Sequence, residues 1–207
     1  MRRASRVIVI AAGLAASVSC GDVVRQGRAP VILVIESLAG ARGSNPSTFG
    51  NPLISDVITN VTSPAPCTSD SPCPTVFGDP GQVVLRIQPK DIGTPGAPTT
   101  PSATNAVTLY RYRVTYRRAD GRNTPGVDVP FAFDGALTAT VFYGAGTTVG
   151  FELVRNDAKV ESPLVQLRTS GVIINSIADV TFYGRDQAGN DVTVTGSMYV
   201  DFGNFGD

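Results

Sequence analysis

The chain has 207 residues, of which 42% are hydrophobic and 16% are charged, and it contains 22 glycines and 15 prolines. Basic and acidic residues number 17 each, so the charge balance does not indicate a nucleic-acid partner or any other general polyanion. Histidine is absent from the whole sequence, which excludes Ser-His-Asp and Cys-His catalysis and most transition-metal sites.

The start of the chain has the pattern of an export signal. Arg2, Arg3 and Arg6 precede an uncharged, largely apolar run, Val7–Ala16, and small residues follow it. The run is shorter than the ~20 apolar residues that a membrane-spanning helix needs. We therefore predict that residues 1–19 are a signal peptide and that the mature protein is exported. Removal of the signal peptide leaves three more acidic than basic residues in the mature protein.

The sequence Ser17-Val18-Ser19-Cys20 resembles the lipobox of bacterial lipoproteins, although its first position is most often Leu in that family. The resemblance covers residues 1 to about 22. It implies that Cys20 receives a lipid and becomes the mature N-terminus, anchored to the bacterial cell envelope. Because Gly21 rather than Asp follows the cysteine, it favours the outer membrane over the inner one. The alternative is ordinary cleavage that leaves a soluble protein with an odd cysteine.

Residues 20–29 form a short tether between this cysteine and the first predicted strand. At ~3.3–3.6 Å per extended residue the tether reaches roughly 30–35 Å, so we expect the folded body to lie close to the membrane. The lipid makes the membrane one partner, and a protein or an envelope polymer is the other partner expected. No cofactor is expected besides the covalent lipid.

From residue 30 to the end, β-branched or alternating runs are bounded by turn-forming residues, and no segment keeps a helical period. The predicted strands are Val31–Leu38, Leu53–Thr59, Gln82–Gln88, Val107–Arg118, Val127–Phe133, Leu137–Tyr143, Thr147–Arg155, Pro163–Arg168, Val172–Tyr183 and Val192–Phe202. Many short strands separated by turns predict a single all-β domain, a sandwich or barrel, over residues 30–207.

The domain divides into a loop-rich first part, residues 30–105, and a strand-dense second part, residues 106–207. Eleven of the 15 prolines lie in the first part between residues 46 and 101, and proline removes a backbone donor that a sheet needs. The segments 40–51, 60–81 and 93–105 are therefore predicted to be long loops at the rim of the sandwich. Long loops in a compact domain are either functional or disordered.

Cys67 and Cys73 are predicted to form a disulfide, because an exported chain folds in an oxidising compartment. The competing interpretation is a metal or redox pair. The sequence offers no histidine or further cysteine to complete a zinc site, and the spacing differs from the redox Cys-x-x-Cys pattern.

The strand Val107–Arg118 alternates between tyrosine and arginine. One face carries Tyr110, Tyr112, Val114 and Tyr116, and the other carries Arg111, Arg113, Thr115 and Arg117. The tyrosines are predicted to pack in the core, with stacking on sugar rings as the alternative. The arginines are predicted to form a solvated face that discourages edge-to-edge association, with contact to anionic lipid headgroups or a ligand as the alternative.

The segment Asp186-Gln187-Ala188-Gly189-Asn190 is predicted to be the loop of a β-hairpin. Asp186, Asn190 and Asp191 place oxygen atoms around it and are a weak calcium candidate. Calcium takes six to eight oxygens, and these residue types are also the ones that a tight turn selects, so turn formation is the favoured interpretation and no metal is expected.

The tyrosine-rich strand and this hairpin together resemble the immunoglobulin-like and fibronectin type III sandwiches of bacterial surface proteins. The resemblance covers about the last hundred residues, and it lacks the buried Trp and the inter-sheet cystine of antibody domains. It implies an immunoglobulin-like antiparallel β-sandwich with long Pro/Gly-rich loops. Binding or scaffolding is the role of most relatives with such a fold.

Few residues are available for catalysis. The only glutamates are Glu36, Glu152 and Glu161, and no local motif pairs two acids as acid and base. Neither Lys90 nor Lys159 lies in a Ser-x-x-Lys pattern, and no glycine-rich stretch has the form of a phosphate loop. The protein is therefore not expected to be an enzyme.

These observations predict a membrane-anchored, extracytoplasmic lipoprotein that acts as a non-catalytic binding or assembly module of the bacterial cell envelope. A structural subunit of an envelope or surface apparatus is the first alternative. A carboxylate-dependent glycan hydrolase that uses Glu152 or Glu161 is the second and less favoured one.

Overall fold

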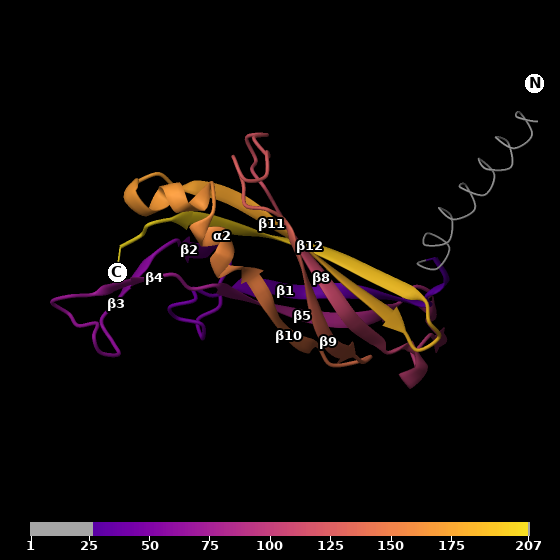
Figure 1. Ribbon diagram of the computed structural model, residues 1–207. Helices are drawn as coiled ribbons and strands as arrows, with labels where there is room; N and C mark the ends of the chain where they lie inside the picture. Colours follow the sequence, from indigo (N-terminus) through magenta and orange to yellow (C-terminus); the bar gives the residue numbers. More distant parts are fainter. Residues whose placement is uncertain (1–26, 207) are drawn as a thin grey trace, which may run out of the picture.

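The computed structural model describes residues 27–206. The predicted signal peptide and the predicted lipidation at Cys20 lie outside the described residues. Within them the chain forms two β-sheets that pack face to face, with short helices and loops at the ends (Figure 1). The prediction of an all-β sandwich is confirmed. The described residues contain no helix with the length and apolarity needed to cross a membrane.

The smaller sheet has three antiparallel strands in the order β1-β5-β10. Its strands are β1 (Val31–Gly40), β5 (Asp79–Pro89) and β10 (Thr147–Val154). Side chains alternate across a strand, so Val83, Leu85 and Ile87 of the central strand β5 all face inward and are fully buried.

The larger sheet has five strands in the order β2-β12-β11-β8-β9. Its strands are β2 (Leu53–Asp56), β8 (Val107–Arg117), β9 (Phe133–Val141), β11 (Ile174–Asp186) and β12 (Asp191–Gly203). Neighbouring strands are antiparallel except β2, which pairs parallel with the end of β12. The long hairpin of β11 and β12 is the one that the sequence predicts.

The remaining elements are short and lie outside the two sheets. They are β3 (Thr59–Val61), β4 (Cys73–Thr75), β6 (Gly93–Thr94), β7 (Ala97–Pro98), η1 (Ala103–Asn105), α2 (Asn156–Val160) and η2 (Leu164–Thr169). β3 pairs with β4 and β6 pairs with β7, so two of the predicted long loops contain small β-ribbons.

Two of the predicted strands are wrong. The segment Val127–Phe133 begins in a turn, closed by backbone hydrogen bonds from Gly126 to Val129 and from Asp128 to Thr124, and joins a sheet only at Phe133, the first residue of β9. The segment Pro163–Arg168 is largely the 3₁₀ helix η2, in which Leu164 and Leu167 are both buried. Residues three positions apart lie on the same face of a 3₁₀ helix. A segment as short as Pro163–Arg168 is too short to distinguish this period from the period of two that is typical of a strand.

Aromatic rings fill the centre of the sandwich. Tyr112 of β8 and Phe182 of β11 contact Phe151 from the opposite sheet, with ring centroids 5.4 and 5.3 Å apart, respectively. Tyr112 and Tyr116 are buried, as predicted, but Tyr110 is 46% exposed. The register between β8 and β9 shifts between Leu109 and Arg111, and this bulge turns Tyr110 outward.

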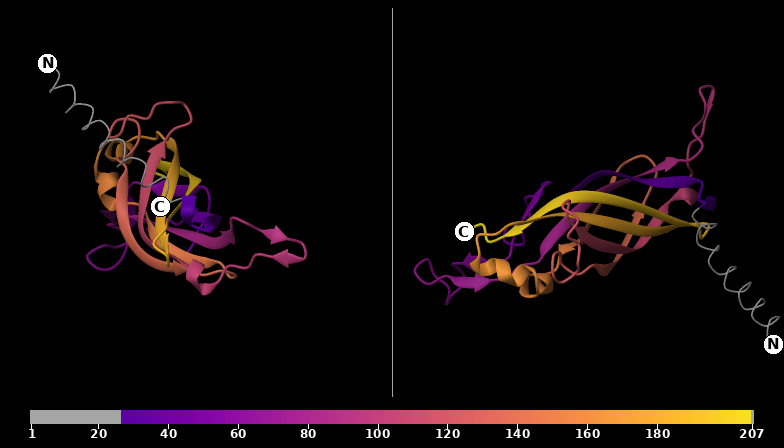
Figure 2. Two further views of the ribbon diagram at one scale, coloured as in Figure 1. Left: turned by 90° about the vertical axis from the view of Figure 1, so that its right-hand side faces the viewer. Right: turned by 90° about the horizontal axis from the view of Figure 1, so that it is seen from above.

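The sandwich has two ends with different contents (Figures 1 and 2). We call one of them the near end, where the described chain enters β1 beside Pro89. The near end also contains the hairpin loop between β11 and β12 and the ribbon of β6 and β7. At the distal end, β1 and β12 finish, and α2, η2 and the ribbon of β3 and β4 lie there. The predicted loops 40–51 and 60–81 are therefore remote from the start of the described chain.

Candidate functional site

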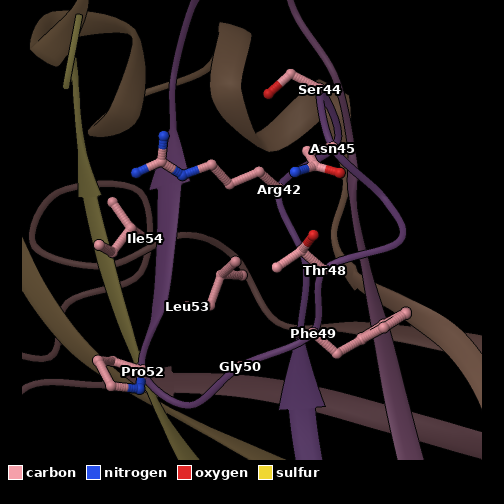
Figure 3. A pocket seen from close by; sticks show the side chains of 10 residues that line it. Arg42, Ser44, Asn45, Thr48, Phe49, Gly50, Pro52, Leu53 and Ile54 are labelled. Atoms are coloured by element: carbon pink, nitrogen blue, oxygen red, sulfur yellow. The ribbon is translucent and has the colours of Figure 1, made fainter.

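A pocket of about 360 Å³ opens at the distal end, where the chain leaves β1 and returns to β2 (Figure 3). Gly40 and Gly50 exchange two backbone hydrogen bonds of 2.9 and 2.8 Å, which close the intervening loop. The pocket is lined by Gly40, Arg42, Ser44, Asn45, Thr48, Phe49, Gly50, Pro52, Leu53 and Ile54. One of the three predicted long loops thus forms a hollow.

Arg42 is the charged residue of this pocket, which we call the distal pocket. In Figure 3 its side chain lies between the polar Ser44 and Asn45 and the apolar Leu53 and Ile54. The guanidinium carbon lies 5.9 Å from the centre of the Phe205 ring, and the group forms no ion pair with any residue between 27 and 206. A half-buried arginine without a carboxylate partner can accept an anionic group from a ligand.

A buried ion pair joins Asp79, the first residue of β5, to Lys159 of α2. Both side chains are 1% exposed, and Lys159 Nζ lies 2.8 Å from each carboxylate oxygen. Gly43 N donates to Asp79 Oδ1 at 2.8 Å, and Ser55 Oγ donates to Oδ2 at 2.5 Å. The pair therefore connects the loop that carries the distal pocket with β2, β5 and α2.

Burial lowers the pKa of Lys159, and the charge of Asp79 opposes this change. Lys159 also donates to the backbone oxygen of Asp56 at 2.8 Å. From the sequence, Lys159 is considered only for a catalytic motif that it does not match, so this buried group is not predicted. No local signal identifies it, because its partners come from segments 80 and 103 residues away.

The arginines of β8 share the outer face of the larger sheet, as predicted, but each has a partner. Arg113 pairs with Asp134 at 2.9 Å and Arg117 pairs with Asp179 at 2.6 Å. Arg111 lies 3.9 Å from Asp134 and 4.0 Å from the centre of the Tyr183 ring. The sheet order places β8 between β11 and β9, so these arginines do not protect an edge, and their charge is matched within the sheet.

The pKa of Asp179 reflects this pairing. Partial burial would raise it, but the hydrogen bonds from Arg117 and Ser197 lower it below its usual range. A carboxylate in this state stays ionised and neutralises the neighbouring guanidinium across the ordinary pH range.

The oxygen atoms of the β11–β12 hairpin loop hold the loop itself. Asp186 is 5% exposed and accepts hydrogen bonds from Ala188 N and from both nitrogens of Asn190, all between 2.8 and 2.9 Å. Asp191 pairs with Arg185 at 2.8 Å. Among residues 27–206, no group of three or more acidic, cysteine or histidine side chains is arranged to hold a metal ion.

Cys67 and Cys73 form a disulfide, with Cα atoms 5.3 Å apart, which confirms the predicted pairing. Cys73 begins β4 and pairs with Val61 of β3, so the disulfide closes the ribbon at the distal end. Its location makes it a local constraint on one of the rim loops.

The two glutamates considered for hydrolysis lie on different elements. Glu152 belongs to β10 and lines an open cavity of about 410 Å³ together with Gly78 and Asn156. Glu161 is exposed and directly follows α2. Glu36, the third glutamate, pairs with Arg86 at 2.7 Å.

Comparison of the chain with models of protein families finds no match, and comparison with curated proteins finds none. The resemblance to bacterial surface sandwiches therefore depends on the residues of the tyrosine-rich strand and of the Asp186–Asn190 hairpin loop.

Proposed function

We propose that this chain is a lipid-anchored protein of the bacterial cell envelope and acts as a non-catalytic binding module through its distal pocket. The observation that carries the proposal is the Arg42 guanidinium in a hollow of the distal end, which has no ion-pair partner among residues 27–206. The described chain begins at the near end, so a molecule anchored through the residues before it would present the distal pocket away from the membrane.

The strand order supports an immunoglobulin-like arrangement. In such domains one sheet has the order G-F-C-C′, and β12-β11-β8-β9 follows the same order and directions. The opposing strands β1-β5-β10 correspond to A, B and E. Domains of this kind use the loops at the ends of the sandwich for binding, while the sheets hold those loops in place.

The lining of the distal pocket indicates the chemistry of the ligand. Arg42 offers a planar fork of donors that suits a carboxylate or a phosphate. Ser44, Asn45 and Thr48 add hydroxyl and amide groups, and Leu53 and Ile54 add apolar surface. We therefore propose that the partner presents an acidic group next to an apolar group, on a protein or on an envelope polymer.

Affinity capture from detergent-solubilised membranes tests this function. The tagged wild-type protein should capture its partner, and Arg42→Ala should reduce the captured amount by about tenfold or more, since a hydrogen bond to a charged group contributes about 1.5–3 kcal/mol. Arg113→Ala is the matched control, because that arginine is exposed and paired within the sheet. Equal capture by the wild type and Arg42→Ala would exclude the distal pocket as the site.

The anchor needs a separate test. Metabolic labelling with a fatty-acid probe should mark the wild type, and Cys20→Ser should lose the label and leave the membrane fraction. An unlabelled wild type that shares its fraction with Cys20→Ser would contradict the lipid anchor.

If the protein instead sediments within a large complex that Arg42→Ala does not disturb, the role of structural subunit would replace that of a binding module.

A further inference from the structure

The buried pair of Asp79 and Lys159 holds an amine nitrogen against a carboxyl group. Lys159 Nζ lies 2.8 Å from both Asp79 Oδ1 and Asp79 Oδ2, so the nitrogen is also held close to the carboxyl carbon that joins these oxygens. Both side chains are 1% exposed, so bulk water does not reach the contact. Reacting groups held this close gain a large effective concentration, because little freedom of motion remains to be lost.

Further donors surround the same carboxyl group. The backbone N–H of Gly43 points to Oδ1 at 2.8 Å, and the hydroxyl of Ser55 points to Oδ2 at 2.5 Å. Fixed donors at these distances stabilise the negative charge that develops on a carboxyl oxygen when a nucleophile attacks its carbon. The burial that lowers the pKa of Lys159 also favours the neutral amine, which is the nucleophilic form.

We propose that Lys159 and Asp79 condense to an intramolecular amide that covalently joins α2 to β5. One ammonium proton passes to the carboxylate within the pair and gives an amine and a carboxylic acid. The Nζ lone pair then attacks Cγ and forms the C–N bond, while the carbonyl electron pair moves onto Oδ1, next to Gly43 N–H. A second proton passes from nitrogen to Oδ2, the electron pair on Oδ1 re-forms the carbonyl, and the Cγ–Oδ2 bond breaks, so that Oδ2 leaves as water with both transferred protons.

The balance of this step needs no oxidant, reductant or other reactant, because an amine and a carboxylic acid give an amide and a water. Burial favours the product, since two buried charges, each costly to desolvate, are replaced by a neutral amide. Gly43 N–H can keep its hydrogen bond to Oδ1, which becomes the amide oxygen. The new bond would connect residues 80 positions apart in the sequence.

Mass spectrometry of a tryptic digest tests the proposal. Purified full-length protein, reduced and alkylated, is digested after confirmation of its fold by circular dichroism. An amide blocks cleavage after Lys159, so the peptide 156–168 should remain whole and be joined to the peptide 43–86. The joined species should be about 18 Da lighter than the sum of its two peptides, the mass of one water. Fragmentation should locate the link at Asp79 and Lys159.

Lys159→Arg is the control that retains the positive charge and cannot form this amide, and it should release the separate peptides. Lys90→Arg, at the only other lysine, should retain the link. Recovery of the free peptides 156–159 and 160–168 from folded wild-type protein, with no joined species, would overturn the proposal and leave an ordinary ion pair.

Discussion

Asp79 receives donors from Lys159, Ser55 and Gly43 while it is almost fully buried. Removal of one member of such a buried group leaves the others desolvated and unpaired. At the scale of single residues, this group therefore determines whether the distal end keeps its shape.

Replacing Asp79 tests its contribution to stability. Asp79→Ala should lower the free energy of unfolding by about 3–5 kcal/mol, because it leaves the Lys159 amine buried without its partner. Urea denaturation measures the change. The control is Asp134→Ala, which removes an exposed partner of Arg113 and should cost less than about 1 kcal/mol. Similar losses in the two variants would contradict the importance assigned to the buried pair.

At the scale of elements, β8 and β10 connect the two sheets through tyrosine hydroxyls. The Tyr116 hydroxyl donates to the backbone oxygen of Leu153 at 2.6 Å, and the Tyr112 hydroxyl accepts from Glu152 N at 3.2 Å. Gly135 of β9 lies opposite Tyr112, and a Cβ there would collide with the ring. These features fix how the sheets pack.

Tyr116→Phe should lower the free energy of unfolding by about 1–3 kcal/mol, because the buried carbonyl of Leu153 loses its hydroxyl donor. Thermal or urea denaturation would show the change. Tyr110→Phe makes the same chemical change at an exposed ring and should have almost no effect. An unchanged stability of Tyr116→Phe would mean that this hydrogen bond does not hold the sheets together.

The same residue makes a prediction about pH. Burial raises the pKa of Tyr116 well above its ordinary value of 10.0. The Tyr116 hydroxyl therefore stays protonated in the folded state at a pH where it ionises in the unfolded state. Its contribution to the free energy of unfolding is complete below pH 10 and is lost as the pH rises further. The free energy of unfolding should fall above about pH 10. Tyr116→Phe should make that decline shallower, and identical pH profiles would contradict the assignment.

The elements also show where local pattern is informative. Three predicted segments form strands in the structure: Val31–Leu38, Thr147–Arg155 and Val192–Phe202. In each of them the β-branched, alternating pattern and the pairing with neighbouring strands favour the same structure. The segment Pro163–Arg168 forms a helix because Leu164 and Leu167 fill the distal end of the core, which is a tertiary requirement.

At the scale of the whole molecule, the ribbon of β3 and β4 lies outside the two sheets and is closed by its own disulfide. Replacing both Cys67 and Cys73 with Ser should speed amide hydrogen exchange in this ribbon and leave exchange in β11 and β12 unchanged, because a small closed loop stabilises mainly its own surroundings. Hydrogen-exchange mass spectrometry measures both regions. Faster exchange throughout the sandwich would show that the ribbon supports the core.

The separation of the two ends predicts an orientation for the anchored protein. β1 has 10 residues and spans about 33 Å from the near to the distal end. On vesicles, a fluorescent label at Gln187→Cys in the near hairpin loop should be quenched by spin-labelled lipid more strongly than a label at Ser47→Cys in the distal loop. Equal quenching would contradict the proposed orientation.

The sequence by itself determined the all-β class, the main strands and the Cys67–Cys73 disulfide, because alternation, turn residues and short spacing are local properties of the chain. Only the tertiary structure decided that a bulge turns Tyr110 outward, that the β8 arginines are paired, and that Arg42 lies in a pocket without an ion-pair partner in the described part of the chain. It also decided the contact of Lys159 with Asp79. Each of these features depends on the register and packing of segments that are distant in the sequence, and no local pattern encodes which distant side chains meet.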